Sequence, residues 1–202
     1  MTVTSKHESA KRKIIDSARP LIGERGFCAV GITQILTQAR IPKGSFYHYF
    51  ESKERFGEEL LSLYMADYLA TVEHIFAQPH PNGHQRVLAY LKFWRVTHSD
   101  GQVGDKCLIV KLAAEISDLS ETMRQIMQTG TARVVERLAQ VVHTGQQDGS
   151  ISSALPAPAV AAALYQTWLG ATLMVKITKS AHPFDTAQHT SALLLTGQVV
   201  GV

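Results

Sequence analysis

The sequence predicts an all-α protein of about nine helices, with a helix-turn-helix near its amino end. Apolar residues recur at intervals of three and four through most of the 202 residues, which is typical of amphipathic helices. No segment alternates apolar and polar residues in the way that a half-buried strand does. Proline, glycine and polar runs separate the periodic segments, and we expect two domains, residues 1–51 and residues 52–202.

The helix-turn-helix is expected in residues 31–50, GITQILTQARIPKGSFYHYF, where two short helices should meet at a tight turn. The apolar residues of the first helix share one face: Ile32, Ile35, Leu36 and Ala39. Pro42 should end that helix and suits the first position of the next one. Phe46 and Phe50 lie four residues apart, so both should point into the core.

The opposite face of the second helix suits a DNA groove. Lys43 and the amino end of the helix can bind phosphate, while Gly44 lets the backbone approach closely. Tyr47 and His48 offer hydrogen bonds to the DNA. The alternative is an αα-hairpin inside a helical core, which would have the same helical spacing.

The next helix supplies a second phosphate anchor. Ser52 should cap this helix, which places Lys53 beside the amino end. The candidate DNA-binding residues are therefore Thr33, Gln34, Lys43, Gly44, Ser45, Tyr47, His48 and Lys53.

Charge is distributed unevenly along the chain. The formal net charge is +3, but residues 1–56 hold ten Lys/Arg against five Asp/Glu, a net of +5, which leaves −2 for the remainder. We expect the basic end to face a polyanion. The polar first residues lack the apolar core of a signal peptide, and the two cysteines, Cys28 and Cys107, form neither a disulfide framework nor a CxxC pair. The expected compartment is the cytoplasm, and neither a metal nor a cofactor is expected.

Several motifs of this region recur together in a known family. The run Arg25-Gly26-Phe27, the segment from Lys43 to Phe50 and the run Ser52-Lys53-Glu54 resemble the DNA-binding domain of TetR-family repressors, over about residues 8–60. The resemblance implies a double-stranded DNA operator. Two positions depart from the family pattern, because Gly31 stands where a capping Thr is common and Arg40 where the turn often has Gly.

The remaining helices are predicted from spacing and breaks, and they follow a first helix that starts near Ser5. They are Ser52–Ala77, His84–His98, a short helix within KCLIVKLAAEI, Asp118–Val142, Ala157–Lys179 and Phe184–Val199. Pro20 should kink the first helix near Asp16. Near its start lie four basic residues for which a solvated face and a DNA contact both remain open: Lys6, Lys11, Arg12 and Lys13.

The last two predicted helices are rich in small and aliphatic residues. Paired with the same helices of a second chain they would form a four-helix interface, so we expect a homodimer that binds a pseudo-palindromic operator. The segment 149–175 carries no charged residue and is long enough to span a membrane. Its serines, prolines and other polar residues favour burial by protein instead.

The most distinctive chemistry in the second domain surrounds Cys107. If Asp105 is an N-cap, Cys107 lies in the first turn of a helix, where free amides, the helix dipole, Lys106 and Lys111 all lower the pKa of a thiol. On spacing alone, a small buried apolar cysteine is the commoner outcome. We interpret Cys28, beside Phe27, as such a packing residue.

Resemblance changes the interpretation of Cys107. The segments 107–115, 168–171 and 176–180 are similar to a branch of the TetR family that includes the repressor of N-ethylmaleimide reductase. This implies that Cys107 senses electrophiles or oxidants together with Lys176. The amine of Lys176 follows a long uncharged run, so it can be desolvated and nucleophilic, although a lysine near a helix end often extends to water.

Three functions follow from these observations. The first is a repressor that is released from DNA by covalent modification of Cys107. The second keeps the same DNA-binding end but binds a noncovalent apolar ligand in a pocket lined by Trp94, Tyr165 and Trp168. The third is an enzyme with Cys107 as the nucleophile, which is the weakest because no residues form a recognisable catalytic relay.

Overall fold

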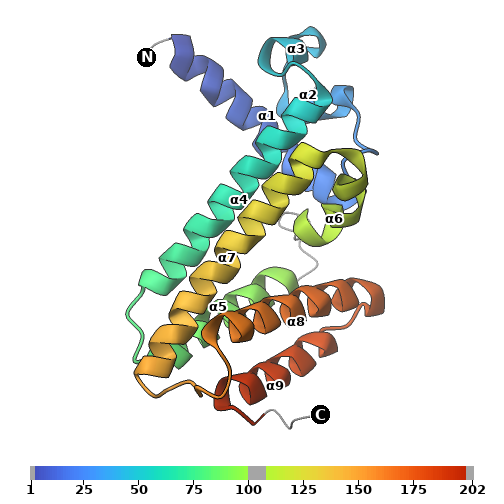
Figure 1. Ribbon diagram of the computed structural model, residues 1–202. Coiled ribbons are helices and arrows are strands. Elements are labelled where there is room, and N and C mark those ends of the chain that lie inside the picture. Colours follow the sequence, from blue (N-terminus) through green and yellow to red (C-terminus); the bar gives the residue numbers. More distant parts are fainter. Residues whose placement is uncertain (1–2, 100–107, 199–202) are drawn as a thin grey trace. The chain divides into compact units, whose positions relative to one another are not determined.

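The computed structural model describes residues 3–99 and 108–198, and all regular structure within them is helical (Figure 1). This confirms the predicted all-α class of about nine helices. The helices are α1 (Val3–Arg25), α2 (Ile32–Ala39), the 3₁₀ turn η1 (Lys43–Ser45), α3 (Phe46–Tyr49), α4 (Lys53–Ala77), α5 (Gly83–Ser99), α6 (Leu108–Leu119), α7 (Glu121–Gln147), α8 (Ala157–Thr178) and α9 (His182–Thr196).

The chain forms two compact units. The first unit comprises Met1–Ala66 and Gly101–Thr129, and the second comprises Asp67–Asp100 and Gly130–Val202. The long helices α4 and α7 each begin in the first unit and end in the second. The predicted boundary after residue 51 separates a DNA-binding domain from an effector-sensing and dimerisation domain. These two units do not test that boundary, which remains a prediction.

Aromatic rings form the core of the first unit. Phe46 and Phe50 are buried as predicted, and they pack with Phe56 of α4 at centroid distances of 5.1–5.7 Å. Phe27 is also buried and lies so close to α4 that a Cβ at Gly57 would come within 2.7 Å of its ring. The core therefore fixes α3 and the α1–α2 loop against the start of α4.

Most helix boundaries agree with the predictions. The hydroxyl of Ser52 accepts a hydrogen bond from the Arg55 amide at 3.0 Å, so it caps α4 as expected. The predicted start of the long helix at Asp118 is wrong, because α6 continues through that residue to Leu119 and α7 begins at Glu121. The last helix begins at His182, before the predicted Phe184, and its predicted end lies outside the described residues.

The core of the second unit is built around α8 and α9. Eight residues of α8 are buried: Ala157, Val160, Ala161, Leu164, Tyr165, Trp168, Ala171 and Thr172. By length and composition α8 is the one helix among the described residues that could cross a membrane. A single helix of this kind is weak evidence for a membrane span, because a core helix of the same length and composition passes the same test.

Candidate DNA-binding face and effector segment

The turn of the helix-turn-helix is built by backbone hydrogen bonds around Arg40. This residue adopts a left-handed conformation with φ 57°, which glycine usually supplies at the end of a helix. Its amide donates to Thr37 O at 3.1 Å, and the Ile41 amide donates to Leu36 O at 2.9 Å. The second helix then starts near Pro42 as predicted, but its first turn is the 3₁₀ segment η1 rather than an α-turn.

The start of α2 compensates for the missing threonine. The side-chain carbonyl of Gln34 accepts a hydrogen bond from the Gly31 amide at 2.9 Å, which forms half of a capping box. Gly31 has no hydroxyl to donate to phosphate, but the helix still begins at the position that the family pattern requires. Gln34 is thus held at the exposed amino end of α2.

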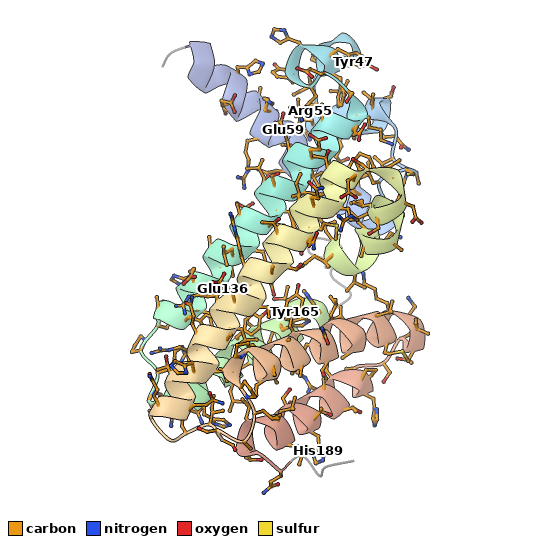
Figure 2. The ribbon with its side chains drawn as sticks, viewed as in Figure 1. Tyr47, Arg55, Glu59, Glu136, Tyr165 and His189 are labelled. Carbon is orange, nitrogen blue, oxygen red and sulfur yellow. The ribbon has the colours of Figure 1, made fainter. Side chains whose placement is uncertain are left out.

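Exposure separates the candidate DNA-binding residues from the core. Tyr47 is 70% exposed and lies at the outer edge of the first unit (Figure 2), and His48 and Gly44 are exposed as well. Thr33 and Gln34 are exposed on α2, whereas Ser45 is half-buried. Tyr47, His48, Gly44, Thr33 and Gln34 are therefore on the surface of the first unit, outside its aromatic core.

The amino end of α1 packs on the second helix, a contact that the sequence did not reveal. The ring of His7 lies 5.5 Å from that of His48 and 5.2 Å from that of Tyr49. In the Nε2–H tautomer, His7 donates to the carbonyl of His48 at 3.3 Å. The first turns of α1 therefore support the residues that the sequence assigns to DNA.

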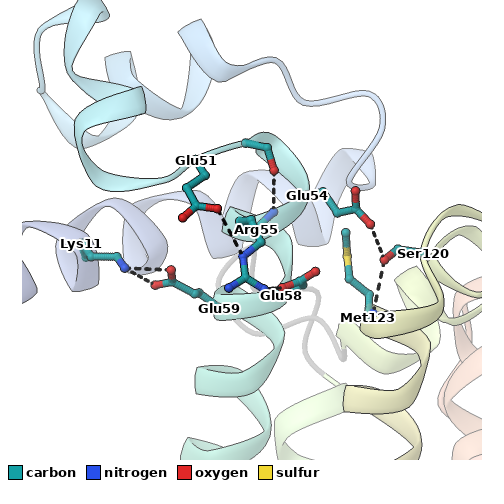
Figure 3. Close-up of polar contacts among 9 residues, drawn as sticks. Lys11, Glu51, Glu54, Arg55, Glu58, Glu59, Ser120 and Met123 are labelled. Carbon is teal, nitrogen blue, oxygen red and sulfur yellow. Dashed lines mark hydrogen bonds and ion pairs between the residues drawn. The ribbon is translucent and has the colours of Figure 1, made fainter.

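Three basic residues in the first half of α1, Lys11, Arg12 and Lys13, have different surroundings. Lys11 forms an ion pair with Glu59 at 2.7 Å (Figure 3), and its amine lies 5.2 Å from the centroid of Phe50. The side chain is 17% exposed, so Lys11 fastens α1 to α4. Arg12 pairs with Asp16 at 3.0 Å, whereas Lys13 is exposed and free to approach phosphate.

The interpretation of Cys28 as a packing residue is wrong, because its side chain is exposed. Lys53 donates to the carbonyl of Cys28 at 3.2 Å, and its amine lies 4.9 Å from the ring centroid of Phe27. The carboxylate of Glu115 accepts hydrogen bonds from the amides of Phe27, at 3.0 Å, and Cys28. A hydrogen bond to Glu115, with slight desolvation and the negative charge of that carboxylate, raises the pKa of Cys28.

This raised pKa predicts slow alkylation of Cys28. Only a thiolate attacks iodoacetamide or a maleimide, and the raised pKa beside Glu115 leaves less thiolate at neutral pH. We expect Glu115→Ala to accelerate alkylation of Cys28 several-fold at pH 7.5, measured by peptide mass spectrometry after timed quenching. The control is Asp118→Asn, which removes an exposed carboxylate from the same helix and should leave the rate unchanged. Equal rates in all three proteins would contradict the assignment of the thiol hydrogen bond.

The structure describes only one of the two candidate effector residues, Lys176. Cys107 lies outside the described residues, as do Asp105 and Lys106. Lys176 lies in the last turn of α8 and is half-buried. The role predicted for the pair therefore remains a proposal.

The three residues predicted to line a pocket come together in the core of the second unit. Trp94 is 5.3 Å from Tyr165 and 6.5 Å from Trp168 between ring centroids, and all three side chains are buried. The indole of Trp94 donates to Thr172 at 2.8 Å and that of Trp168 donates to Ser191 at 2.9 Å. Among residues 3–99 and 108–198 no group of three His, Cys, Asp or Glu side chains could hold a metal ion.

Comparison with known proteins decides the family. Residues 14–60 match the family described as bacterial regulatory proteins, tetR family, and residues 83–191 match the tetracyclin repressor-like C-terminal domain. The transcriptional repressor NemR of Escherichia coli strain K12 is 33% identical over 200 residues, covering 98% of this chain and 100% of NemR. The chain belongs to the TetR family of transcriptional regulators.

Other TetR-family relatives agree. The repressor DhaR of Mycobacterium sp. strain GP1 is 30% identical over 87% of this chain and 86% of its own length. The crystal structure of the reduced form of Escherichia coli NemR aligns with a TM-score of 0.87 at 34% identity, covering 95% of this chain and 100% of that one. A second TetR/AcrR-family structure aligns with a TM-score of 0.84 at 39% identity, covering 93% and 99%. TetR-family repressors bind DNA operators and act as dimers, and the relatives of this chain are transcriptional repressors, not enzymes.

Proposed function

We propose that the protein is a cytoplasmic, homodimeric repressor that binds a pseudo-palindromic operator through α2 to α4 and is released when an electrophile or oxidant modifies Cys107. The exposure of the polar residues on α2 and α3, among them Gln34, Tyr47 and His48, supports the DNA-binding part of this proposal. The effector part rests on the full-length similarity to NemR and on the residues around Cys107.

Gly44 supports close contact with DNA. A Cβ built at this position would meet no described atom within 4 Å, so the packing of the described residues does not require glycine there. A side chain would nevertheless project from an exposed position between Lys43 and Tyr47, into the space that a DNA backbone would occupy. Glycine at this position suits an approach of the protein backbone to phosphate.

Lys43 and Lys53 should contribute through phosphate. We expect Lys43→Ala to weaken binding to operator and to unrelated DNA by similar factors, and to lower the slope of log K against log salt by about one. Lys53→Ala should lower the slope in the same way and weaken binding further, because its amine also donates to the carbonyl of Cys28 in the α1–α2 loop. The measurement is fluorescence anisotropy at several salt concentrations. The matched control is Lys92→Ala, an exposed lysine of the second unit, which should leave the slope unchanged. A selective loss of operator binding would show instead that these lysines read bases.

The surface of α8 supports the homodimer. Leu173, Met174 and Ile177 are 48%, 45% and 64% exposed, and they share one side of the helix at spacings of three and four. A second copy of α8 and α9 would cover these apolar side chains in a four-helix arrangement. Two recognition helices related by the resulting two-fold axis would bind two half-sites.

The chemistry proposed for Cys107 requires a thiolate. A maleimide accepts the sulfur at one carbon of its double bond, and a proton from solvent adds to the other. Hypochlorous acid, the protonated form of hypochlorite, transfers Cl⁺ to the thiolate sulfur and leaves hydroxide. The amine of Lys176 can then displace chloride, which forms a sulfur–nitrogen bond and releases a proton. The noncovalent pocket is less favoured, because the indoles of Trp94 and Trp168 already donate to side chains of the protein.

Substitution of the cysteines and of Lys176 distinguishes covalent sensing at Cys107 from noncovalent binding in the pocket. We expect Cys107→Ser to bind operator normally but to lose release by N-ethylmaleimide and by hypochlorite, since a neutral hydroxyl does not attack either reagent at pH 7. Cys28→Ser is the matched control and should still respond. Lys176→Ala should respond to N-ethylmaleimide but only weakly to hypochlorite, because it cannot form the sulfur–nitrogen bond. Normal release of Cys107→Ser by both reagents would overturn covalent sensing in favour of the pocket.

A further inference from the structure

The loop between α1 and α2 is fixed from two sides within the first unit. From α6, the carboxylate of Glu115 accepts hydrogen bonds from the backbone amides of Phe27, at 3.0 Å, and Cys28. From α4, the amine of Lys53 donates to the backbone carbonyl of Cys28 at 3.2 Å. Two consecutive loop residues are thus bound through their main chain, by charged side chains from two other helices.

Gly26, which precedes Phe27 and Cys28, shows how closely the carboxylate of Glu115 approaches the loop. Gly26 ends α1 with a φ of +95°, which side-chain-bearing residues rarely adopt. A Cβ at this position would also lie 2.9 Å from Oε2 of Glu115. The positive φ favours glycine here, and the absence of a Cβ lets the carboxylate of Glu115 lie close to the backbone.

The loop in turn determines where the DNA-binding helices begin. It leads to Gly31, the N-cap of α2, and its Phe27 is buried against Gly57 of α4. We propose that Glu115 is a positioning residue for operator binding, which holds the α1–α2 loop and therefore the start of α2 in place against α6. The proposal rests on DNA binding by the helix-turn-helix and is independent of the chemistry at Cys107.

The helix that carries Glu115 is itself firmly anchored in this unit. Leu112 and Ile116 of α6 are fully buried on either side of Glu115 in sequence. Directly after α6, the hydroxyl of Ser120 donates to Glu54 of α4 at 2.7 Å (Figure 3). Glu54 is adjacent to Lys53 in the first turn of α4. The α6 region therefore makes two kinds of polar contact, one from Ser120 to the first turn of α4 and one from Glu115 to the α1–α2 loop.

The ionisation of Glu115 agrees with this role. Burial alone would raise the pKa of this carboxyl group, but hydrogen bonds from the Cys28 thiol and from the amides of Cys28 and Phe27, with the charge of Lys111, together lower it. The ionised form is thus the one that the loop binds. A neutral amide at this position would offer a single oxygen to two backbone donors.

The test compares Glu115→Ala, Glu115→Gln and the control Asp118→Asn in the full-length protein. Operator affinity is measured by anisotropy well below the unfolding temperature, and hydrogen exchange of the α6 peptide is measured with and without operator DNA. Thermodynamic linkage requires that, if α6 positions the loop, operator binding also changes exchange in α6. A residue that serves only for stability would leave that response intact in the folded variant.

We expect Glu115→Ala to bind operator about tenfold more weakly than wild type and to lose most of the operator-dependent change in α6 exchange, with Glu115→Gln between the two. Asp118→Asn should match wild type in both measurements. If Glu115→Ala does not fold, operator affinity and α6 exchange measured on Glu115→Gln test the proposal instead. Affinity within about twofold of wild type, or an α6 response that persists unchanged, would overturn the proposal. Failure of the wild-type protein to bind DNA would instead refute the proposed function.

Discussion

Replacing Phe46 by alanine is expected to unfold the DNA-binding helices and to abolish operator binding. Phe46 is fully buried, and its ring lies 5.3 Å from that of Phe50 and 5.7 Å from that of Phe56. Truncation of such a phenylalanine costs about 3–5 kcal/mol, because apolar contacts are lost and a cavity remains. That is a large fraction of the stability of a small domain, about 5–15 kcal/mol.

The adjacent residue provides the matched control. Tyr47 follows Phe46 in the same helix but is 70% exposed, so Tyr47→Ala should change the free energy of unfolding by no more than about 0.5 kcal/mol while weakening operator binding. Thermal unfolding followed by circular dichroism, with anisotropy on operator DNA, separates the two effects. Wild-type stability and affinity in Phe46→Ala would contradict the packing described for α3.

The second large effect is expected from Ile177→Glu. Ile177 is 64% exposed on the apolar side of α8, and the partner α8 would bury this side chain. A glutamate there would place an unpaired charge in the interface, which proteins avoid at high cost. We expect a monomer at micromolar concentration by sedimentation velocity, and operator affinity at least about 100-fold lower, because one recognition helix then binds without the effective concentration supplied by its partner.

Val96→Glu is the control for this substitution. Val96 belongs to α5 of the same unit and is 63% exposed, so the change in charge and the exposure of the original side chain are closely matched. This variant should remain a dimer with wild-type affinity. A dimeric Ile177→Glu protein would show that another surface joins the subunits.

Local patterns predicted most of the fold. Helical spacing and the cap at Ser52 placed α4 correctly, and the pair Phe46 and Phe50 identified the buried side of the second helix. The boundary between α6 and α7 was misplaced because Asp118 and Ser120 are both good N-caps, so the local signal is ambiguous. The contact of Ser120 with Glu54, 66 residues away in sequence, lies at the break that the structure adopts.

Contacts between distant segments could not be predicted from one sequence. Glu115 binds residues 87 and 88 positions away, and no periodic pattern relates a helical glutamate to the backbone of a remote loop. Lys11 had two open interpretations, and only the structure shows its ion pair with Glu59. The exposure of Cys28 was missed for the same reason, since the neighbouring Phe27 is buried and sequence alone does not give the direction of each side chain.

Modification of Cys107 is proposed to release the protein from its operator. The most direct measurement treats the operator complex with a graded series of N-ethylmaleimide concentrations, and follows released DNA by anisotropy and adducts on each cysteine by peptide mass spectrometry in the same samples. We expect the released fraction to rise in proportion to the adduct on Cys107 and to be independent of the adduct on Cys28. Full release with Cys107 unmodified, or a stoichiometric Cys107 adduct with the operator still bound, would contradict it.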